Sequence, residues 1–349
     1  MKQQKVIISS NLKETATGAV GEVDYDRLFI LVDDTTEQLC LPKVKDIAVL
    51  SAAGKIVIPS TDSNKTLESL THVWSELGRM GATRHSLLVN LGGGMVTDLG
   101  GFAASTFKRG IAYINIPTTL LSMVDASVGG KTGINFGGLK NEIGVFNNAN
   151  SVILDTTFLE TMASENICSG YAEMLKHALI SDEKMWADLI NFNLEQPDLV
   201  RLRQMVADSV NVKQRIVTED PTEHGLRKAL NLGHTAGHAF ESLALSRKPV
   251  LHGYAVAYGL VTELYLSALK CGFPTDCLHQ TVGFIKEHYG KMSITCDDYP
   301  VLLELMSHDK KNIGSEINFT LLGGIGDLRL NQTATTKEIE ESLDFYREC

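Results

Sequence analysis

The sequence predicts an α/β domain followed by a mainly helical domain, and three observations support this prediction. The chain has 349 residues, enough for two domains that each bury a core. Short runs rich in β-branched residues alternate with helical patterns as far as about residue 155. Beyond that point, most segments carry apolar residues at helical spacing. We therefore expect one domain over residues 1–157 and a second over residues 158–349.

Apolar runs of strand length define the first domain. We expect strands at residues 27–33, 46–52, 54–60, 86–94, 111–117 and 151–155, with helices at residues 65–79 and 95–107. This alternation favours a mainly parallel sheet. In the second domain, only residues 317–326 look like a strand, and we expect helices at residues 169–180, 183–194, 197–217 and 255–270.

Composition and charge narrow the class of protein. A formal net charge of −10 argues against a nucleic-acid-binding protein, whose affinity rests on a basic surface, but it leaves room for an anionic small molecule in a local cationic pocket. The six cysteines form no CxxC pair. The N-terminus lacks the apolar core of a secretion signal, and no run of about 18 apolar residues predicts a membrane span. We expect a reduced, cytoplasmic protein without a nucleic-acid or membrane partner.

Three histidines in one short stretch are the most informative side chains. His234 and His238 are four residues apart, so on a helix they share one face, and His252 follows a loop that contains Pro249. A single histidine of this kind is usually a hydrogen-bonded core residue. Three together, set among glycines, favour a metal site with an open coordination position or a proton-transfer site.

A glycine run at the end of an apolar strand marks a candidate anion site. Gly92, Gly93 and Gly94 precede a predicted helix, where backbone amides and the helix dipole attract phosphate. The run departs from the GxGxxG pattern at Thr97, and no P-loop lysine follows. From this segment alone, a nucleotide site and a simple tight turn both remain open.

A second glycine-rich stretch brings cations together. Residues 129–131 (GGK) and 138–141 (GLKN) place positive charge and amide donors on turns, with Arg109 upstream. Thr118 and Thr119 either cap the next helix or hydrogen-bond a ligand. A lone exposed lysine usually has no role, but two such clusters favour a pocket for phosphate or carboxylate.

These segments, taken in order, resemble the 3-dehydroquinate synthase family of the sugar phosphate cyclases. The matching motifs span residues 92–314 and are GGGMVTDLGGFAASTFKRG, IPTTLLSMVDASVGGKTGIN, GLKNEIGVF, SGYAEMLKH, GLRKALNLGHTAGHAFE, HGYAVAYG and HDKKNIG. The resemblance implies a Rossmann-like NAD-binding α/β domain followed by a mainly helical metal- and substrate-binding domain, usually in a homodimer.

The resemblance also implies the reaction. The family converts 3-deoxy-D-arabino-heptulosonate 7-phosphate to 3-dehydroquinate and phosphate, a carbon–oxygen lyase step of the shikimate pathway to chorismate and the aromatic amino acids. The steps implied are oxidation by NAD+, elimination of phosphate, reduction and intramolecular aldol closure. A divalent metal, zinc or cobalt, is implied as well.

By the same resemblance, individual residues acquire roles. The metal ligands would be Glu173, His234 and His252. The catalytic residues would be Asp125, Lys131, Asn141, Lys176, Lys213 and His238. Of these, Lys131, Asn141, Lys213 and His238 would bind the substrate together with Arg109, Arg227, Asn231, Lys310 and Lys311. NAD would contact Asp33, Asp62, Lys65, Gly93, Gly94, Asp98, Thr118, Thr119, Lys140 and Thr161. The carboxylate of Asp98 would repel pyrophosphate, so we expect it to accept hydrogen bonds from cofactor hydroxyls or from the backbone.

Four positions depart from the family pattern. Glu165 and Asn166 stand where an Arg-Glu pair is usual, Tyr254 replaces the acid of an HGE motif, and Asp62 replaces a glutamate. None of these changes removes an implied metal ligand or an implied phosphate contact. Changes at such places alter metal affinity or rate about 10- to 100-fold.

Three alternatives stay open. Another cyclase, of the 2-deoxy-scyllo-inosose or valiolone type, would share the cofactor and the metal, although Lys140, Asn141, Arg227 and Asn231 match the dehydroquinate pattern. A metal-dependent polyol dehydrogenase would release NADH steadily. A non-catalytic NAD-binding homologue would bind the cofactor without turnover, because a fold does not fix a function.

Overall fold

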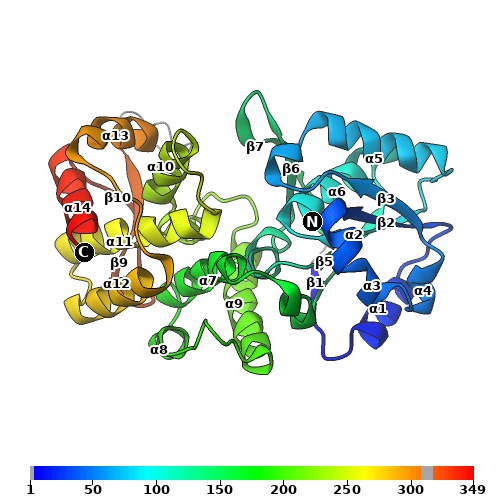
Figure 1. The fold of residues 1–349 in the computed structure, drawn as a ribbon, viewed down its shortest axis with the longest axis horizontal. Helices are drawn as coiled ribbons and strands as arrows, with labels where there is room; N and C mark the ends of the chain where they lie inside the picture. The colour runs from blue at the N-terminus through cyan, green and yellow to red at the C-terminus, as the bar shows by residue number, and fades with distance from the viewer. Residues whose placement is uncertain (1–3, 308–316) are drawn as a thin grey trace. The chain divides into compact units, whose positions relative to one another are not determined.

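The computed structural model describes residues 4–307 and 317–349, which form two compact units (Figure 1). The first unit comprises the described residues up to Ala163 together with Leu199–Val210, and the second comprises Ser164–Asp198 and Asn211–Cys349. The first segment of this unit thus runs to Ala163, whereas we expected a boundary at residue 157. It includes a 3₁₀ helix, η4 (Thr156–Thr161), that directly follows the last sheet strand. The assignment of NAD to one domain and of metal and substrate to the other stays a prediction.

A six-stranded sheet forms the centre of the first unit, and every pair of neighbouring strands in it is parallel. Its strands, in spatial order, are β1 (Lys5–Ile8), β8 (Ser151–Leu154), β5 (Ala112–Pro117), β4 (Leu87–Gly92), β2 (Leu28–Asp33) and β3 (Gly54–Ile58). The inner strands are apolar on both faces, as expected for a parallel sheet covered by helices.

Helices cover both faces of this sheet (Figure 1). They are α1 (Leu12–Gly21), α2 (Asp34–Leu39), α3 (Leu41–Val44), α4 (Ala48–Ser51), α5 (Leu67–Arg79) and α6 (Gly94–Thr106), with short turns η1 (Asp62–Asn64), η2 (Phe107–Arg109) and η3 (Ser122–Ala126). Right-handed crossovers place α1 to α4 on one face and α5 and α6 on the other. The connections diverge between β2 and β4, and ligands of such sheets bind beyond the strand ends at this switch point.

The predicted strand at residues 46–52 is wrong. Residues Ala48–Ser51 form the helix α4, and the buried side chains Val44, Ile47 and Leu50 recur every three residues, as on a helix. A short apolar run does not distinguish a strand from a buried helical turn by its periodicity alone.

An antiparallel hairpin in the first unit was not predicted. Its strands β6 (Lys131–Phe136) and β7 (Leu139–Phe146) are joined by Gly137 and Gly138, which have φ angles of 60° and 82°. Two successive residues with positive φ give the tight turn that matches the twist of a hairpin, and glycine adopts it without strain. The hairpin carries the Gly–Lys clusters that the sequence had suggested to be separate turns.

The second unit is mainly helical, as predicted. Its helices are α7 (Ser164–Leu179), α8 (Glu183–Ile190), the later part of α9 (Leu199–Glu219), η5 (Leu226–Asn231), α10 (His234–Leu245), α11 (His252–Cys271), α12 (Thr275–Tyr289), η6 (Cys296–Asp298), α13 (Tyr299–Ser307) and α14 (Thr336–Glu348). The predicted strand β9 (Asn318–Gly324) pairs antiparallel with β10 (Asp327–Thr333), which was not predicted. The apolar helix α11 packs against α7, α10, α12, α14 and β9 and forms the centre of this unit.

Within residues 4–307 and 317–349, no helix combines the length and the apolar character needed to cross a membrane.

Candidate metal centre and cofactor site

The helix α7 buries two opposite charges one turn apart. Glu173 is 0% exposed and Lys176 is 1% exposed, and the Lys176 ammonium donates a hydrogen bond to Oε2 of Glu173. Taking two charges out of water is costly unless each is compensated by partners. Lys176 compensates only one of the two carboxylate oxygens, so Oε1 of Glu173 depends on other groups.

His234 is the first residue of α10, and a buried carboxylate from another helix fixes this helix end. Gly233 precedes it with φ 76° and offers no side-chain cap. Instead, Glu263 of α11 accepts hydrogen bonds from the backbone N–H of Gly233 (2.6 Å) and of Ala236 (3.1 Å). Because Glu263 supplies the missing cap, the backbone that carries His234 is held against α11.

His252 is the first residue of α11, and the glycine that follows it lets α11 start against α7. A Cβ atom at Gly253 would overlap the carbonyl oxygen of Ser169, so no larger residue fits here. The Gly253 N–H donates to Oγ of Ser169 at 3.1 Å. This close approach places His252 beside the helix that carries Glu173.

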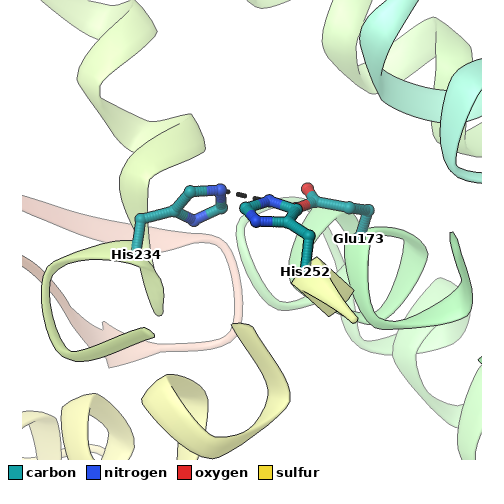
Figure 2. Close-up of side chains that lie close together, drawn as sticks. All are labelled: Glu173, His234 and His252. Atoms are coloured by element: carbon teal, nitrogen blue, oxygen red, sulfur yellow. Dashed lines mark ion pairs between the residues drawn. The ribbon is translucent and has the colours of Figure 1, made fainter. Parts of the chain in front are cut away.

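Glu173, His234 and His252 converge on one point (Figure 2). Oε1 of Glu173 lies 3.4 Å from Nε2 of His234 and 3.5 Å from Nε2 of His252. The other ring nitrogens face acceptors: Nδ1 of His234 lies 3.1 Å from the Leu232 carbonyl oxygen, and Nδ1 of His252 lies 3.2 Å from Oε2 of Glu241. Each Nδ1 therefore carries a proton, and in a neutral ring the Nε2 lone pair points towards Glu173.

These three residues fit a divalent metal ion. Among the described residues, Oε1 of Glu173 has no hydrogen-bond partner although it is fully buried. A metal ion bound between the two imidazole nitrogens and this carboxylate oxygen would give the buried oxygen a partner. One carboxylate and two histidines also form a common ligand set of catalytic zinc sites, which keep a further position open.

The pKa values of the three groups are shifted by burial and by the charges around them. Burial by itself would raise the pKa of Glu173, but Lys176 and His234 hold that pKa well below its usual range. Burial and the nearby Lys176 charge lower the pKa of His234 to about 4. Burial would also lower the pKa of His252, but Glu173 and Glu241 raise it to about 10. A metal ion bound here would compete with a proton for the Nε2 atoms of the two histidines.

His238 lies beside this group but outside it. It is one helical turn after His234, and its ring centroid lies 5.3 Å from that of His234 and 6.0 Å from that of His252. The exposed side of its ring leaves it accessible to a substrate. This arrangement agrees with a histidine that faces the substrate rather than the metal.

The remaining predicted residues of the second unit lie on α9 and η5. Lys213 and Arg227 are 6% and 2% exposed, and Asn231 lies three residues before His234. The carboxylate of Asp220 accepts hydrogen bonds from the N–H groups of Gly225 (2.7 Å) and Arg227 (3.0 Å) and thereby fixes the backbone at Arg227. These hydrogen bonds, that of Gly225 first, lower the pKa of Asp220 to about 2.

In the first unit, each predicted NAD contact except Lys140 lies at or after the carboxyl end of a parallel strand. They follow β2 (Asp33), β3 (Asp62, Lys65), β4 (Gly93, Gly94, Asp98), β5 (Thr118, Thr119) and β8 (Thr161). Strands of a parallel sheet end at the same edge, so the sequence positions converge without any local motif that links them. Lys140 reaches the group from the hairpin, with Nζ 3.6 Å from Oδ2 of Asp62.

The glycine run leaves the N-terminus of α6 without a side-chain cap. Gly93 is the capping residue, and it has no side chain that could bond the first amides of the helix. The missing third glycine of the dinucleotide pattern is explained by Gly100, because a Cβ atom there would overlap Asn90 of β4. Gly100 thus supplies the close contact of helix and strand, while Thr97 bonds its hydroxyl to the Gly94 carbonyl at 3.1 Å. This arrangement favours the anion site over a simple tight turn.

A buried lysine connects three of the predicted residues of this unit. Lys65 is 3% exposed, and its ammonium donates to Oδ2 of Asp98 (2.9 Å) and to Oδ1 of Asn141. Burial raises the pKa of Asp98, and the Lys65 charge opposes that shift. We had expected Asp98 to accept hydrogen bonds from cofactor hydroxyls or from the backbone. Its partner in the structure is instead the side chain of Lys65.

The two threonines and Asp33 have structural partners of their own. Oγ1 of Thr119 accepts the N–H of Ser122 at 3.1 Å, so Thr119 caps the following turn, and Thr118 donates its N–H to the Gly92 carbonyl at 3.0 Å. Asp33 caps α2 through the N–H of Thr36 at 2.7 Å. A capping role does not prevent contact with a ligand, and the contacts of these residues with NAD stay predictions.

The residues predicted to bind phosphate lie on exposed parts of the first unit. Arg109 ends η2, Lys131 begins β6, and Asn141 lies on β7 with φ 52°. Asp125 is half-buried in η3. Their roles stay predictions, and Lys310 and Lys311 lie outside the described residues.

Three departures from the family pattern lie away from the metal ligands or have structural partners. Glu165 and Asn166 are exposed in the first turn of α7, where a negative charge suits the helix dipole. Tyr254 packs on Tyr289 with ring centroids 5.1 Å apart. Burial, followed by the nearby Cys168 thiol, raises the pKa of Tyr254 to about 12, so its hydroxyl stays neutral.

Sequence reasoning missed three acidic residues that bond the backbone or side chains of the site residues. They are Asp220, Glu241 and Glu263. Only Glu263 left a signal in the sequence, because it is a single acid in an otherwise apolar stretch of α11. A charge in such a stretch is buried and needs a partner.

Two family models match the chain in sequence. The model described as 3-dehydroquinate synthase N-terminal matches residues 55–169, and the one described as 3-dehydroquinate synthase C-terminal matches residues 170–312. A 3-dehydroquinate synthase of Parabacteroides distasonis is 54% identical over 349 residues, which is 100% of this chain and 99% of that protein. One of Streptococcus pyogenes serotype M3 is 34% identical over 99% of this chain and 96% of its own length.

Solved structures agree with the fold. A 2-epi-5-epi-valiolone synthase of Streptomyces hygroscopicus with NAD+ and Zn²⁺ bound has a TM-score of 0.87 at 25% identity, covering 100% of this chain and 98% of that chain. A 2-deoxy-scyllo-inosose synthase complexed with carbaglucose-6-phosphate, NAD+ and Co²⁺ has a TM-score of 0.82 at 21% identity, covering 99% and 96%. The predicted fold class is thereby confirmed. Because the two models together match residues 55–312 and a full-length relative is 54% identical, the chain belongs to the 3-dehydroquinate synthase family.

Proposed function

We propose that the chain catalyses the 3-dehydroquinate synthase reaction, in which 3-deoxy-D-arabino-heptulosonate 7-phosphate yields 3-dehydroquinate and phosphate. One observation carries the proposal. In a chain of this family, two imidazole nitrogens face a buried carboxylate oxygen that has no hydrogen-bond partner among the described residues. This is the ligand set that a Lewis-acid metal requires.

Two cofactors complete the proposed site. A divalent metal held by Glu173, His234 and His252 would supply a Lewis acid for the substrate hydroxyl and for the ketone formed from it. NAD+ at the strand ends of the first unit would take up a hydride and return it within one turnover. The valiolone and inosose synthases solved with NAD+ and with Zn²⁺ or Co²⁺ support this pair.

Buried cations of the second unit would bind the carboxylate side of the substrate. Lys176, Lys213 and Arg227 are each at most 6% exposed, so water screens their charges less than it screens those of surface residues. Asn231 would add a neutral donor. His238 would exchange a proton with a substrate hydroxyl, because its ring lies beside the metal ligands and remains exposed.

The hairpin of the first unit would bind the substrate phosphate through Lys131 and Asn141, together with Arg109. The backbone N–H of Asn141 donates to Oδ1 of Asn135 at 2.9 Å, and its side chain accepts from Lys65. Lys65 therefore ties the proposed phosphate contact to the proposed NAD contacts at Asp98. Asp125 would bind a substrate hydroxyl.

The proposal includes a homodimer in the cytoplasm. The family resemblance supports the dimer, and the net charge of −10 supports the absence of a nucleic-acid partner. Light scattering on the purified protein measures the mass, and a value of one 38.1 kDa chain would contradict the dimer.

Phosphate release from 3-deoxy-D-arabino-heptulosonate 7-phosphate tests the function. We expect release in the presence of NAD+ and Zn²⁺ or Co²⁺, without net formation of NADH. A chelator and the variant His234→Ala should abolish it. The control is His279→Ala, which changes an exposed histidine of α12 and should leave the rate unchanged.

The outcomes separate the alternatives. Steady NADH formation would indicate a polyol dehydrogenase. Bound NAD+ and metal without phosphate release would exclude 3-deoxy-D-arabino-heptulosonate 7-phosphate as the substrate. Release from other sugar phosphates would then indicate a cyclase of the inosose or valiolone type, whose structures resemble this chain.

A further inference from the structure

We propose that Glu241 is a positioning residue for the metal ligand His252, whose ring it orients so that Nε2 points at the metal. The inference rests on the metal centre of the proposed function.

The contact between the two side chains is direct. Oε2 of Glu241 lies 3.2 Å from Nδ1 of His252, and the Glu241 side chain is 11% exposed. An ionised carboxylate only accepts hydrogen bonds, so it selects the ring form that carries its proton on Nδ1. That form leaves the Nε2 lone pair on the side of Glu173, 3.5 Å from Oε1.

His252 needs this partner more than His234 does. The His234 ring is held by the Leu232 carbonyl only two residues away, and Glu263 caps its helix. His252 follows a loop whose residues 245–249 are exposed. The contact of Gly253 with α7 fixes the backbone at His252 but does not fix the ring. The ring is oriented from α10, on which Glu241 lies seven residues, or about two turns, after His234.

The charge of the partner also affects the strength of the ligand. A carboxylate that accepts the Nδ1 proton increases the electron density on the ring, which a neutral backbone carbonyl does less. Loss of such a partner lowers metal affinity about 10- to 100-fold in other metalloenzymes. His252 should therefore be the more strongly electron-donating ligand of the two histidines, because Glu241 accepts its Nδ1 proton whereas a backbone carbonyl accepts that of His234.

A direct ligand role for Glu241 is the competing explanation. Ligand atoms of His238, Glu241 and His252 also lie within 4.8 Å of one another. A metal bound there would use Nδ1 of His252 and would not need Glu173. Removal of Glu173 and removal of Glu241 therefore have opposite consequences in the two arrangements.

Metal affinity of the full chain tests the inference. We would titrate the metal-free wild type, Glu241→Gln, Glu241→Ala and Glu173→Gln with Zn²⁺ against a chelator, and record visible spectra with Co²⁺. Glutamine keeps an acceptor for the Nδ1 proton but not the charge. We expect Glu241→Ala to bind about 10- to 100-fold more weakly than the wild type and Glu241→Gln to lie between them. At saturation, the Co²⁺ bands should shift but keep the intensity of an unchanged coordination number.

Control and contrary outcomes are distinct. Glu338→Gln removes a carboxylate from an ion pair with Lys270 in the same unit and should bind metal like the wild type.

Equal affinity of wild type, Glu241→Gln and Glu241→Ala would overturn the inference and leave the proposed function intact. Greater loss in Glu241→Ala than in Glu173→Gln would assign Glu241 as a ligand and overturn the positioning role. No metal binding by the wild type would contradict the proposed function itself. If Glu241→Ala does not fold, the comparison of wild type with Glu241→Gln decides.

Discussion

The candidate metal centre of the second unit and the predicted NAD region of the first unit present their functional groups in different ways. At the candidate metal centre, the buried Glu173 of α7 faces the half-buried His234 of α10 and His252 of α11 and also pairs with Lys176. In the predicted NAD region, residues follow the ends of parallel strands, where glycines and backbone amides provide much of the surface. Single substitutions among the candidate metal ligands should therefore abolish phosphate release. Single substitutions in the predicted NAD region should only weaken NAD+ binding.

The largest effect should come from Glu173→Gln. The substitution removes the charge that balances Lys176 and the metal, and leaves the lysine buried without its partner. We expect loss of bound metal and a fall in phosphate release of at least about 10³-fold, since several kcal/mol of charge stabilisation are lost. Metal analysis and the phosphate assay measure both. Glu165→Gln, exposed on the same helix, is the control, and equal effects of the two would refute the assignment.

Glu263→Ala should destabilise the second unit. It leaves the buried N–H groups of Gly233 and Ala236 without their acceptor, at a cost of about 1–3 kcal/mol for each donor. Urea unfolding measures the loss, and metal affinity should fall with it because His234 begins the same helix. Glu287→Ala, exposed on α12, should unfold like the wild type. An unchanged unfolding midpoint in Glu263→Ala would show that the cap does not hold α10.

Lys65→Met should weaken NAD+ binding without affecting the metal. The variant removes charged hydrogen bonds to Asp98 and Asn141, each worth about 1.5–3 kcal/mol. We expect about a 10- to 100-fold higher Kd for NAD+, because 1.4 kcal/mol corresponds to about tenfold. Calorimetry with NAD+ and a Zn²⁺ titration separate the two affinities. Lys55→Met, which breaks an exposed ion pair between Lys55 of β3 and Glu37 of α2, is the matched control. A parallel loss of metal affinity would contradict the independence of the two regions.

The smallest effect concerns pH. The pKa of Asp220 is about 2 in the folded chain, whereas an unfolded aspartate has a pKa of about 3.9. The stabilisation by Asp220 is therefore fully present above pH 4 and is lost as the pH falls towards about 2. We expect the melting temperatures of wild type and Asp220→Asn to differ at pH 6 and to approach each other as the pH falls towards about 2. A difference that is independent of pH would show that the charge of Asp220 does not stabilise this loop.

The sequence predicted those elements whose apolar pattern is strong. Buried strands such as β4 and helices such as α5 and α6 lie where expected. It missed β10, in which exposed and half-buried residues alternate with few large apolar side chains, and it missed the β6–β7 hairpin. The Gly137-Gly138 pair is a hairpin signal, but the flanking strands carry lysines and glycines that resemble a loop.

At the candidate site, the order and type of the motif residues sufficed to select Glu173, His234 and His252, which the structure brings together. The sequence did not predict Glu241 and Glu263, because nothing near them in the chain identifies their partners. Glu263 accepts the N–H of Gly233, thirty residues earlier, and Glu241 bonds a ring eleven residues later.

The sequence by itself determined the fold class, the family and the residue types that can bind metal, phosphate and NAD. These depend on local patterns of apolar residues, glycines and histidines, which persist in an unfolded chain. Only the tertiary structure decided which nitrogen of each histidine faces Glu173, which buried charges balance one another, and where α4 replaces a strand. Those outcomes depend on contacts between distant segments, since the cost of burying a charge or a polar group is set by the partner that packing brings to it.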